Sequence, residues 1–297
     1  MQLSETATLE QVAALLWEMP ELSAFPRRAP QNLKAYAGLL DQAANASASQ
    51  TLLPLFAVAA VDEATSAWRI DPARLARGCG DLVRILTAAA LRQAPQATPI
   101  HRQLAAAWGA DEAGAGLIHQ ALVLCADHEL NASSFTARCV ASTGASLKAA
   151  VIAALAALGG VKHGAVTTRV ERLWDALDPQ DPGKSLRQRL AVGEDIPGFG
   201  HPLYPGGDIR AQALLASVLP DFQPAARFSE AAGELTGAGP SIDFALVALR
   251  RYLQLPEGSA FLLFAIGRSV GWIAHGLEQR ATDQLIRPRA LYTGERP

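Results

Sequence analysis

The sequence predicts an all-α protein. Apolar residues recur three and four positions apart over most of the chain, which is the spacing of an amphipathic helix. Alanine, the residue that most favours helix, is abundant. Alternating runs of β-branched and aromatic residues, which are typical of strands, are almost absent. No internal repeat stands out. The helical spacing, with short interruptions, predicts many helices with short connections.

Ten segments carry the helical spacing. In chain order they are residues 10–17, 31–44, 72–91, 100–108, 113–125, 142–158, 166–176, 209–218, 242–253 and 259–279. Segments rich in glycine, proline or polar residues separate them, at 20–30, 93–99, 159–160, 178–183, 191–207 and 236–241. The helix at 142–158 runs into a glycine pair, and Asp208 is expected to cap the helix at 209–218.

Composition limits the function classes. At 297 residues the chain can bury a full core, in one large domain or two smaller ones. A formal net charge of −2 gives no electrostatic footprint for nucleic acid or an anionic membrane. Cys79, Cys125 and Cys139 lack metal-type spacing and predict buried thiols in a reducing compartment. The first residues lack a signal-peptide pattern and the apolar run 149–161 is too short for a bilayer, so we expect a cytoplasmic protein without metal.

Residues 196–210 contain the most informative pattern. His201 follows two closely spaced glycines, whose backbone can adopt conformations that side chains forbid. A histidine held there can act as an acid, a base or a hydrogen-bond donor near neutral pH. Arg210 is expected in the first turn of the next helix, where its charge opposes the helix dipole. A bound anion would compensate, so the segment predicts acid–base chemistry on a carboxylate or phosphate.

Two further histidines stand at expected helix ends. His128 and Asn131 lie three residues apart after an apolar helix and are expected on one helix face, as a solvated helix end or as part of a site. His163 is expected to open the helix after Gly159 and Gly160. There the dipole would keep its imidazole neutral and able to donate to a developing oxyanion. The alternative is an exposed histidine beyond a helix stop.

Asp243, Arg268 and Arg287 each admit two interpretations. With Ser241 as N-cap, Asp243 would lie in the first helical turn, where the dipole favours its charge; catalysis is the alternative. Arg268 lies in the middle of an almost wholly apolar helix and needs a partner. That partner is either a protein carboxylate or the carboxylate of a substrate. Arg287 lies in a tail that is either a basic frayed end or part of a site.

Together, and in their order along the chain, these motifs resemble the citrate synthase family. The resemblance covers roughly residues 103–294 and extends more weakly to 8–17. It is carried by residues 126–146, Gly-Gly-Val-Lys-His-Gly at 159–164, Pro-Gly-Phe-Gly-His-Pro-Leu-Tyr at 197–204 with Asp-Ile-Arg at 208–210, Ile-Asp-Phe-Ala at 242–245, Gly-Arg-Ser-Val-Gly-Trp-Ile-Ala-His at 267–275, and Arg-Pro-Arg-Ala-Leu-Tyr-Thr-Gly at 287–294.

The resemblance implies an acyltransferase that joins acetyl-CoA to a 2-oxo acid, usually oxaloacetate, to give citrate and CoA. Asp243 matches the base that removes a proton from the acetyl methyl group. His163 matches the group that hydrogen-bonds the thioester oxygen as it becomes an enol. His201 matches the group that donates toward the ketone of the oxo acid. A weakly acidic thioester proton requires such a donor and base together.

The resemblance also implies the binding residues. The ligands of the oxo-acid carboxylates match His128, Arg210 and Arg268, and an arginine that enters the site from the neighbouring subunit matches Arg287. The stretch that lines the CoA adenine matches Pro197, Gly198, Phe199 and Gly200. No permanently bound cofactor is implied, because acetyl-CoA or another acyl-CoA acts as co-substrate.

The architecture implied by the resemblance is an all-α homodimer. Each chain would have a large dimerisation domain, residues 1–165 and 268–297, and a small domain, residues 166–267, that closes over the substrates. The expected partners are therefore small-molecule substrates and a second copy of the chain, with no nucleic acid and no membrane.

Several departures from the family pattern indicate a divergent branch. The family usually reads His-Gly-Gly-Ala-Asn where residues 163–167 read His-Gly-Ala-Val-Thr, and Asp-Phe-Tyr-Ser-Gly where 243–247 read Asp-Phe-Ala-Leu-Val. Pro202 and Pro205 stand where the family often places a basic residue near the CoA phosphates. The chain also starts inside the usual N-terminal region, as a shortened member would. These features predict an altered acyl donor or acceptor, or a chain that needs a paralogous partner subunit. The alternative function is a non-catalytic or regulatory chain that binds a small carboxylate or CoA.

Overall fold

The structure is a computed structural model that describes residues 2–30, 34–40, 46–59 and 71–294. Within these residues the regular structure is helical, which confirms the all-α prediction, and the β-structure amounts to one isolated bridge between Phe199 and Pro240. The helices are α1 (Leu3–Thr6), α2 (Leu9–Leu16), α3 (Glu21–Ala24), α4 (Lys34–Leu40), α5 (Ala48–Ala59), α6 (Pro72–Leu91), α7 (Ile100–Trp108), α8 (Glu112–Cys125), α9 (Ala132–Ser142), α10 (Leu147–Leu158), α11 (Val166–Ala176), α12 (Pro182–Ala191), α13 (Ile209–Ala216), the 3₁₀ turn η1 (Leu219–Asp221), α14 (Gln223–Thr236), α15 (Ile242–Tyr252) and α16 (Ser259–Thr282).

Helical periodicity locates several elements correctly and misses others. Helices α6, α7 and α11 have the predicted ends. The predicted helix 142–158 is wrong at its start, because α9 ends at Ser142 and α10 begins at Leu147. The helix is interrupted there by Gly144, which has φ 85°, and by Ser146, whose side chain caps α10. Of the predicted helix 31–44, residues 34–40 are helical and the remainder lies outside the described residues.

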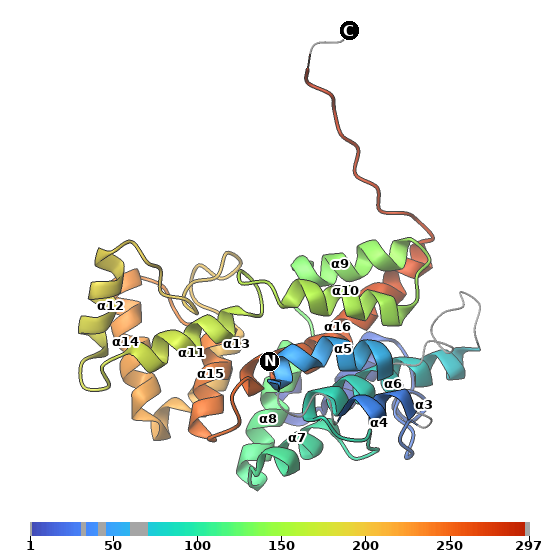
Figure 1. Cartoon of the computed structure of the whole chain (residues 1–297), viewed down its shortest axis with the longest axis horizontal. Helices are drawn as coiled ribbons and strands as arrows, with labels where there is room; N and C mark the ends of the chain where they lie inside the picture. Colours follow the sequence, from blue (N-terminus) through green and yellow to red (C-terminus); the bar gives the residue numbers. More distant parts are fainter. Residues whose placement is uncertain (1, 31–33, 41–45, 60–70, 295–297) are drawn as a thin grey trace.

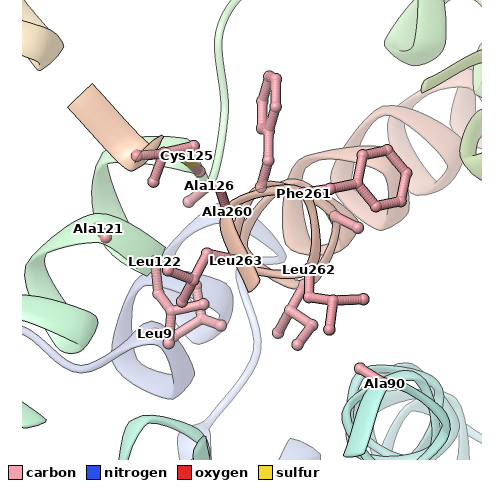
Figure 2. Packing of buried hydrophobic residues seen from close by; sticks show 14 of the residues in the cluster. Leu9, Ala90, Ala121, Leu122, Cys125, Ala126, Ala260, Phe261, Leu262 and Leu263 are labelled. Atoms are coloured by element: carbon pink, nitrogen blue, oxygen red, sulfur yellow. The ribbon is translucent and has the colours of Figure 1, made fainter. Parts of the chain in front are cut away.

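The helices form two groups that α16 joins (Figure 1). One group consists of α11 to α15; the other holds α1 to α10 and most of α16. Helix α16 packs against α8, α9, α10 and α2, and most of its residues are buried. Figure 2 shows core side chains of this helix, including Leu262 and Leu263, and Leu9 and Leu122 from neighbouring helices. Burial of such side chains stabilises the fold by about 2 kcal/mol each.

Two glycines of α16 allow its close approach to the end of α8: Gly267 faces Leu122 and Cys125, and Gly271 faces the turn that follows. Gly271 donates its backbone N–H to the carbonyl of Ala126 at 2.9 Å. A Cβ at Gly271 would collide with that carbonyl and with the side chain of Asp127. The close approach therefore requires glycine, and it fixes the turn that carries His128 against α16.

Aromatic rings fill the core of the α11–α15 group. Trp174 of α11 stacks on Phe244 of α15, with ring centroids 5.5 Å apart. Phe199 and Phe228 also pack on Phe244, at 4.9 and 5.1 Å. This cluster holds the first turn of α15, which carries Asp243, against the loop that carries residues 197–200.

Helix α16 is also the one described helix that is long and apolar enough to cross a membrane by those criteria alone. Within the protein, however, 83% of its apolar window is buried, as in the core helix of a folded domain.

Candidate active site

A cavity of about 310 Å³ lies between the two groups of helices. It is lined from both sides, by the α8–α9 turn, the turn before α11, the loop 195–202, and residues of α13, α15 and α16. All but one of the predicted site residues line it: His128, His163, Pro197, Gly198, Phe199, Gly200, His201, Arg210, Asp243 and Arg268. Arg287 does not; it lies exposed in the C-terminal segment, which extends away from the body of the molecule (Figure 1).

A larger cavity, of about 670 Å³, lies elsewhere. It is formed by the start of α5 and α16, the ends of α6 and α7, and one side of α11. None of the predicted site residues lines it. The smaller cavity is therefore the candidate active site, because titratable groups with shifted pKa values gather there.

Asp243 is a buried carboxyl in the first turn of α15. Ser241 occupies the N-cap position but its side chain does not cap the helix; its hydroxyl donates instead to Oδ2 of Asp243 at 3.4 Å. Within the described chain, Oδ1 of Asp243 is buried without a hydrogen-bond partner. Burial raises the pKa of Asp243 to about 7, although the nearby charge of Arg210 opposes the shift. The helix dipole, which would favour the charged form, therefore does not control the pKa of Asp243.

His163 lies in the turn between α10 and α11, not in the helix that it was expected to open, since α11 begins at Val166. Its Nε2 lies 2.9 Å from Oγ of Ser133, which also accepts a hydrogen bond from Nε1 of Trp272 at 3.0 Å. Burial, helped by the charge of Arg268, lowers the pKa of His163 to about 4. The imidazole is therefore neutral at pH 7 and carries a single ring proton.

The expectation that His128 and Asn131 share a helix face is wrong. Both residues lie in the turn between α8 and α9. Asn131 is the N-cap of α9: its Oδ1 accepts from the backbone N–H groups of Ser133 and Ser134. His128 contacts the other group of helices, with its Nε2 2.8 Å from Oη of Tyr204. Burial lowers the pKa of His128 to about 4, and nearby arginines add to the shift.

His201 is also held neutral. The backbone N–H of Leu203 donates to its Nδ1 at 3.2 Å, so the ring proton of the neutral form is on Nε2. Burial lowers the pKa of His201, and Arg210 adds to that effect. Nε2 is thus left as a hydrogen-bond donor.

The two arginines of the cavity differ in what holds them. Arg210 forms a bidentate ion pair with Asp208, with Nε 3.0 Å from Oδ1 and Nη2 2.7 Å from Oδ2. Asp208 caps α13 as predicted, and it compensates the charge for which an external anion was inferred. It also accepts from the backbone N–H of Ile242, which ties α13 to α15. Although burial opposes it, the bonds from Arg210 hold the pKa of Asp208 below its usual value.

Arg268 is wholly buried. Its Nε donates to the carbonyl of Cys125 at 2.6 Å, and its Nη2 is buried without a partner. No carboxylate of the described residues forms an ion pair with it. Burial lowers the pKa of Arg268 to about 10, so the guanidinium remains charged at pH 7. Of the two predicted partners of Arg268, a protein carboxylate is therefore not found among the described residues. The unpartnered Nη2 favours the other, the carboxylate of a ligand.

The loop 197–200 approaches α11 and α15 closely. Gly198 has φ 87°, and a Cβ there would lie 2.7 Å from Cγ2 of Val170. Its carbonyl accepts from the N–H of Ser241, and Gly200 donates to the carbonyl of Gly239, both at 2.8 Å. The loop is therefore fixed to the residues just before Asp243.

A family model for the citrate synthase C-terminal domain matches residues 1–289. The chain belongs to the citrate synthase family. It is 37% identical to a citrate synthase of Haloferax volcanii over 187 residues, which is 59% of this chain and 49% of that protein. It is 34% identical to a 2-methylcitrate synthase of Corynebacterium glutamicum over 191 residues, 59% of this chain and 49% of that protein. The chain spans about half the length of these curated relatives.

Solved citrate synthases share the fold. The crystal structure of the Thermotoga maritima enzyme matches 99% of this chain and 87% of its own, with a TM-score of 0.78 and 25% identity. A ternary complex of citrate synthase from Thermoplasma acidophilum, with carboxymethyl coenzyme A and oxaloacetate, matches 98% of this chain and 87% of its own, with a TM-score of 0.80 and 22% identity.

Several residues of this candidate site were missed from the sequence. Ser133 and Trp272 hold His163, and Tyr204 contacts His128. Lys162 and Arg169 line the same cavity, with Arg169 paired to Asp195 at 2.6 Å, and supply basic side chains where Pro202 supplies none. The motif Asn-Ala-Ser-Ser at 131–134 is an N-cap signal that could have located Ser133.

Among the described residues, no group of His, Cys, Asp and Glu could hold a metal.

Proposed function

We propose that the chain condenses acetyl-CoA with a 2-oxo acid, oxaloacetate foremost, to give citrate and CoA. The observation that carries the proposal is Asp243, a buried carboxylate with an unpartnered oxygen and a pKa raised to about 7, in one cavity with three neutral histidines. A carboxylate with that pKa is half ionised at neutral pH and more basic than an ordinary aspartate.

In the proposed reaction, Asp243 takes a proton from the methyl group of the thioester. His163 donates a hydrogen bond to the thioester oxygen, which becomes the enol oxygen. For this the ring proton must be on Nδ1. In the structure the hydroxyl of Ser133 donates to Oδ1 of Asn131 at 2.8 Å, so it would have to turn from Asn131 and donate to Nε2 of His163 across 2.9 Å. A neutral donor at this place stabilises the oxyanion without carrying a charge of its own.

Carbon–carbon bond formation then needs a donor on the ketone of the oxo acid. Nε2–H of His201 can fill this role, because Leu203 keeps the other nitrogen as an acceptor. The ketone oxygen takes up a proton through Nε2–H of His201 as the new bond forms, and the proton that Asp243 took from the methyl group restores the balance. Water then cleaves the citryl thioester: its hydroxyl goes to the acyl carbon and its remaining hydrogen to the sulfur, which releases CoA as a thiol. Exclusion of bulk water before that step would prevent hydrolysis of acetyl-CoA.

The carboxylates of the oxo acid are assigned to His128, Arg210 and Arg268. Arg268 supports this assignment best, because a buried guanidinium nitrogen without a partner needs an acceptor. Two arginines that face one small cavity suit a dicarboxylate better than a monocarboxylate such as pyruvate.

Acyl-CoA is assigned to the mouth of the cavity as a co-substrate. The adenine would lie along Pro197–Gly200, where hydrogen bonds fix the backbone and the two glycines carry no side chain that would keep a ligand away. Lys162 offers positive charge to the phosphates, and Arg169 would do so only by leaving its ion pair with Asp195. The relative named 2-methylcitrate synthase makes propionyl-CoA a donor to be tried beside acetyl-CoA.

We also propose the predicted assembly. The small, closing domain would be residues 166–267 and the large one residues 1–165 and 268–297, as the two groups of helices in Figure 1 suggest. In a homodimer, the extended tail would carry Arg287 to the neighbouring site. Free Cys79, Cys125 and Cys139 are compatible with the cytoplasm.

The test is thiol release from acetyl-CoA and propionyl-CoA with oxaloacetate, pyruvate and 2-oxoglutarate. We expect the highest rate with acetyl-CoA and oxaloacetate, and a loss of at least a thousandfold in Asp243→Asn, on the order of what removal of an essential base costs. Absence of thiol release with every pair would refute the enzyme. Binding of oxaloacetate or CoA without turnover would then establish the alternative, a regulatory or partner subunit.

A further inference from the structure

Tyr204 connects the two sides of the candidate site. It lies in the loop before α13, within the α11–α15 group, whereas His128 lies in the α8–α9 turn of the other group. Oη of Tyr204 is 2.8 Å from Nε2 of His128, and the two rings lie 5.3 Å apart. The ring of Tyr204 also lies 5.1 Å from that of His201 and 5.7 Å from the guanidinium carbon of Arg210.

The chemistry of the pair determines which group donates. His128 is neutral at pH 7, because its pKa is about 4, so one of its ring nitrogens is a proton acceptor. Phenols as a class are stronger acids than the N–H of a neutral imidazole, so the hydroxyl is the better donor. Tyr204 O–H then donates to Nε2, and the ring proton of His128 is on Nδ1.

From this geometry we infer that Tyr204 is a positioning residue that sets the tautomer of His128, and with it the affinity of the site for the oxo-acid carboxylate. The inference rests on the proposed function only for the identity of that ligand. The adjacent Leu203 does the same for His201 through its backbone N–H. One short loop thus sets the protons of two histidines, one of its own and one across the cavity.

The loop itself is well fixed for this role. The N–H of Tyr204 donates to the carbonyl of His201 at 3.0 Å, and the carbonyl of Tyr204 accepts from Gly207 at 2.9 Å. Without the hydroxyl, His128 could also place its proton on Nε2, which would leave a lone pair on Nδ1 facing an anion. A carboxylate would lose one charge-assisted donor.

The first test is Tyr204→Phe, which keeps the ring against Arg210 and both histidines and removes the hydroxyl. Tyr252→Phe is the matched control, since Tyr252 packs on Phe222 at the far end of α15. We expect the KM for oxaloacetate to rise about tenfold, the loss of one hydrogen bond, with kcat and the KM for acetyl-CoA nearly unchanged. Equal losses in kcat and in both KM values, with a lower Tm, would show a merely structural role and overturn the inference.

A second variant removes the residue through which Tyr204 acts. If the effect passes through His128, Tyr204→Phe will add nothing to His128→Asn. Additive effects of the two substitutions would refute the inference that Tyr204 acts through His128.

The tautomer is measured directly by ¹⁵N NMR of the histidine side chains, with His128 assigned from its loss in His128→Asn. The wild-type protein should show a protonated Nδ1 and a bare Nε2 at His128, and Tyr204→Phe should show a shift toward the other tautomer. Unchanged His128 nitrogens, or a proton on Nε2 in the wild type, would contradict the inference. This measurement needs no turnover, so it decides the role of Tyr204 even if no acyl-CoA proves to be a substrate.

Discussion

At the scale of single residues, the site depends on buried groups whose protonation is shifted in opposite senses. Burial raises the pKa of Asp243 to about 7 and lowers those of His163 and His128 to about 4. In each case the charged form is disfavoured, because the cavity lies in the low-dielectric interior. The result is a strong base next to neutral donors, which is the combination that removal of a weakly acidic proton requires.

This arrangement predicts the pH dependence of the reaction. Because Asp243 must be ionised, kcat/KM should fall about tenfold per pH unit below a midpoint near 7. His163 and His128, with pKa values of about 4, stay neutral above pH 5 and add no second limb there. A pH–rate profile from 5 to 9 measures this, and a flat profile down to pH 5 would exclude Asp243 as the base.

Linkage gives the same residue an effect on stability. Its folded pKa is above the unfolded value near 3.8, so the folded state holds a proton that the unfolded state releases between pH 4 and 7. The contribution of Asp243 to stability is therefore present below pH 4 and lost as the pH rises through 7. Asp243→Asn should accordingly raise the Tm at pH 8 while it abolishes activity.

Ser133 and Ser134 form a natural pair for a second prediction. Both are fully buried, but Oγ of Ser133 contacts His163, Trp272 and Asn131, whereas Oγ of Ser134 finds no partner in the part of the chain that the structure describes. Ser133→Ala should cost about 1–3 kcal/mol of unfolding free energy and lower kcat on the order of tenfold, since His163 loses its anchor. Ser134→Ala should leave both nearly unchanged. Denaturant unfolding and steady-state kinetics provide the comparison, and equal behaviour of the two variants would disprove the proposed anchor.

The sequence could locate these residues only in part. Asp243, His163 and His201 stand in motifs, so the resemblance found them, but local patterns could not decide whether dipole or burial controls the pKa of Asp243. Tyr204 stands in the same motif as His201 but was given no role, because its contact joins residues 76 positions apart. A hydrogen bond between two loops depends on the tertiary fold and leaves no periodicity in the chain.

At the scale of elements, sequence patterns worked where a helix has a broad apolar face. Helices α6 and α11 bury such faces, and their ends match the prediction. Helix α12 was missed because it is mostly polar, with only Gly183 and Leu186 buried. Helix α14 was missed because its buried face contains the small residues Ala225 and Ala232 around Phe228. Short apolar side chains give a weak periodic signal even when they are wholly buried.

The contact between α16 and the α8–α9 turn predicts the effect of one methyl group. Gly271→Ala would push a Cβ into the carbonyl of Ala126, so we expect a loss of about 1–3 kcal/mol and weaker binding of oxaloacetate through displacement of His128. Gly116→Ala is the control, because a Cβ there meets nothing within 4 Å on the exposed face of α8. It should stabilise the protein by up to about 1 kcal/mol. Equal Tm values for the two variants would contradict the packing argument.

At the scale of the whole molecule, the proposed dimer makes a quantitative prediction. Asp243→Asn removes the base and Arg287→Ala removes the residue expected from the neighbour, so each variant alone should be inactive. In a mixed dimer one site would combine an intact Asp243 with the partner's intact Arg287. Co-refolded equal mixtures should regain roughly a quarter of the wild-type activity, since half of the dimers are mixed and each has one intact site. No recovery, or a monomer in sedimentation, would refute the shared site.

Helix α16 has a consequence for any closing movement. The expected domain boundary after residue 267 falls inside this continuous helix, one residue before Arg268. A rotation of α11–α15 would therefore turn about a rod that both groups share, rather than about a flexible linker. Arg268, wholly buried on that rod, would stay still while Arg210 and His201 move toward it. The substrate would then be held first at a fixed charge, and the moving side chains would complete the site around it.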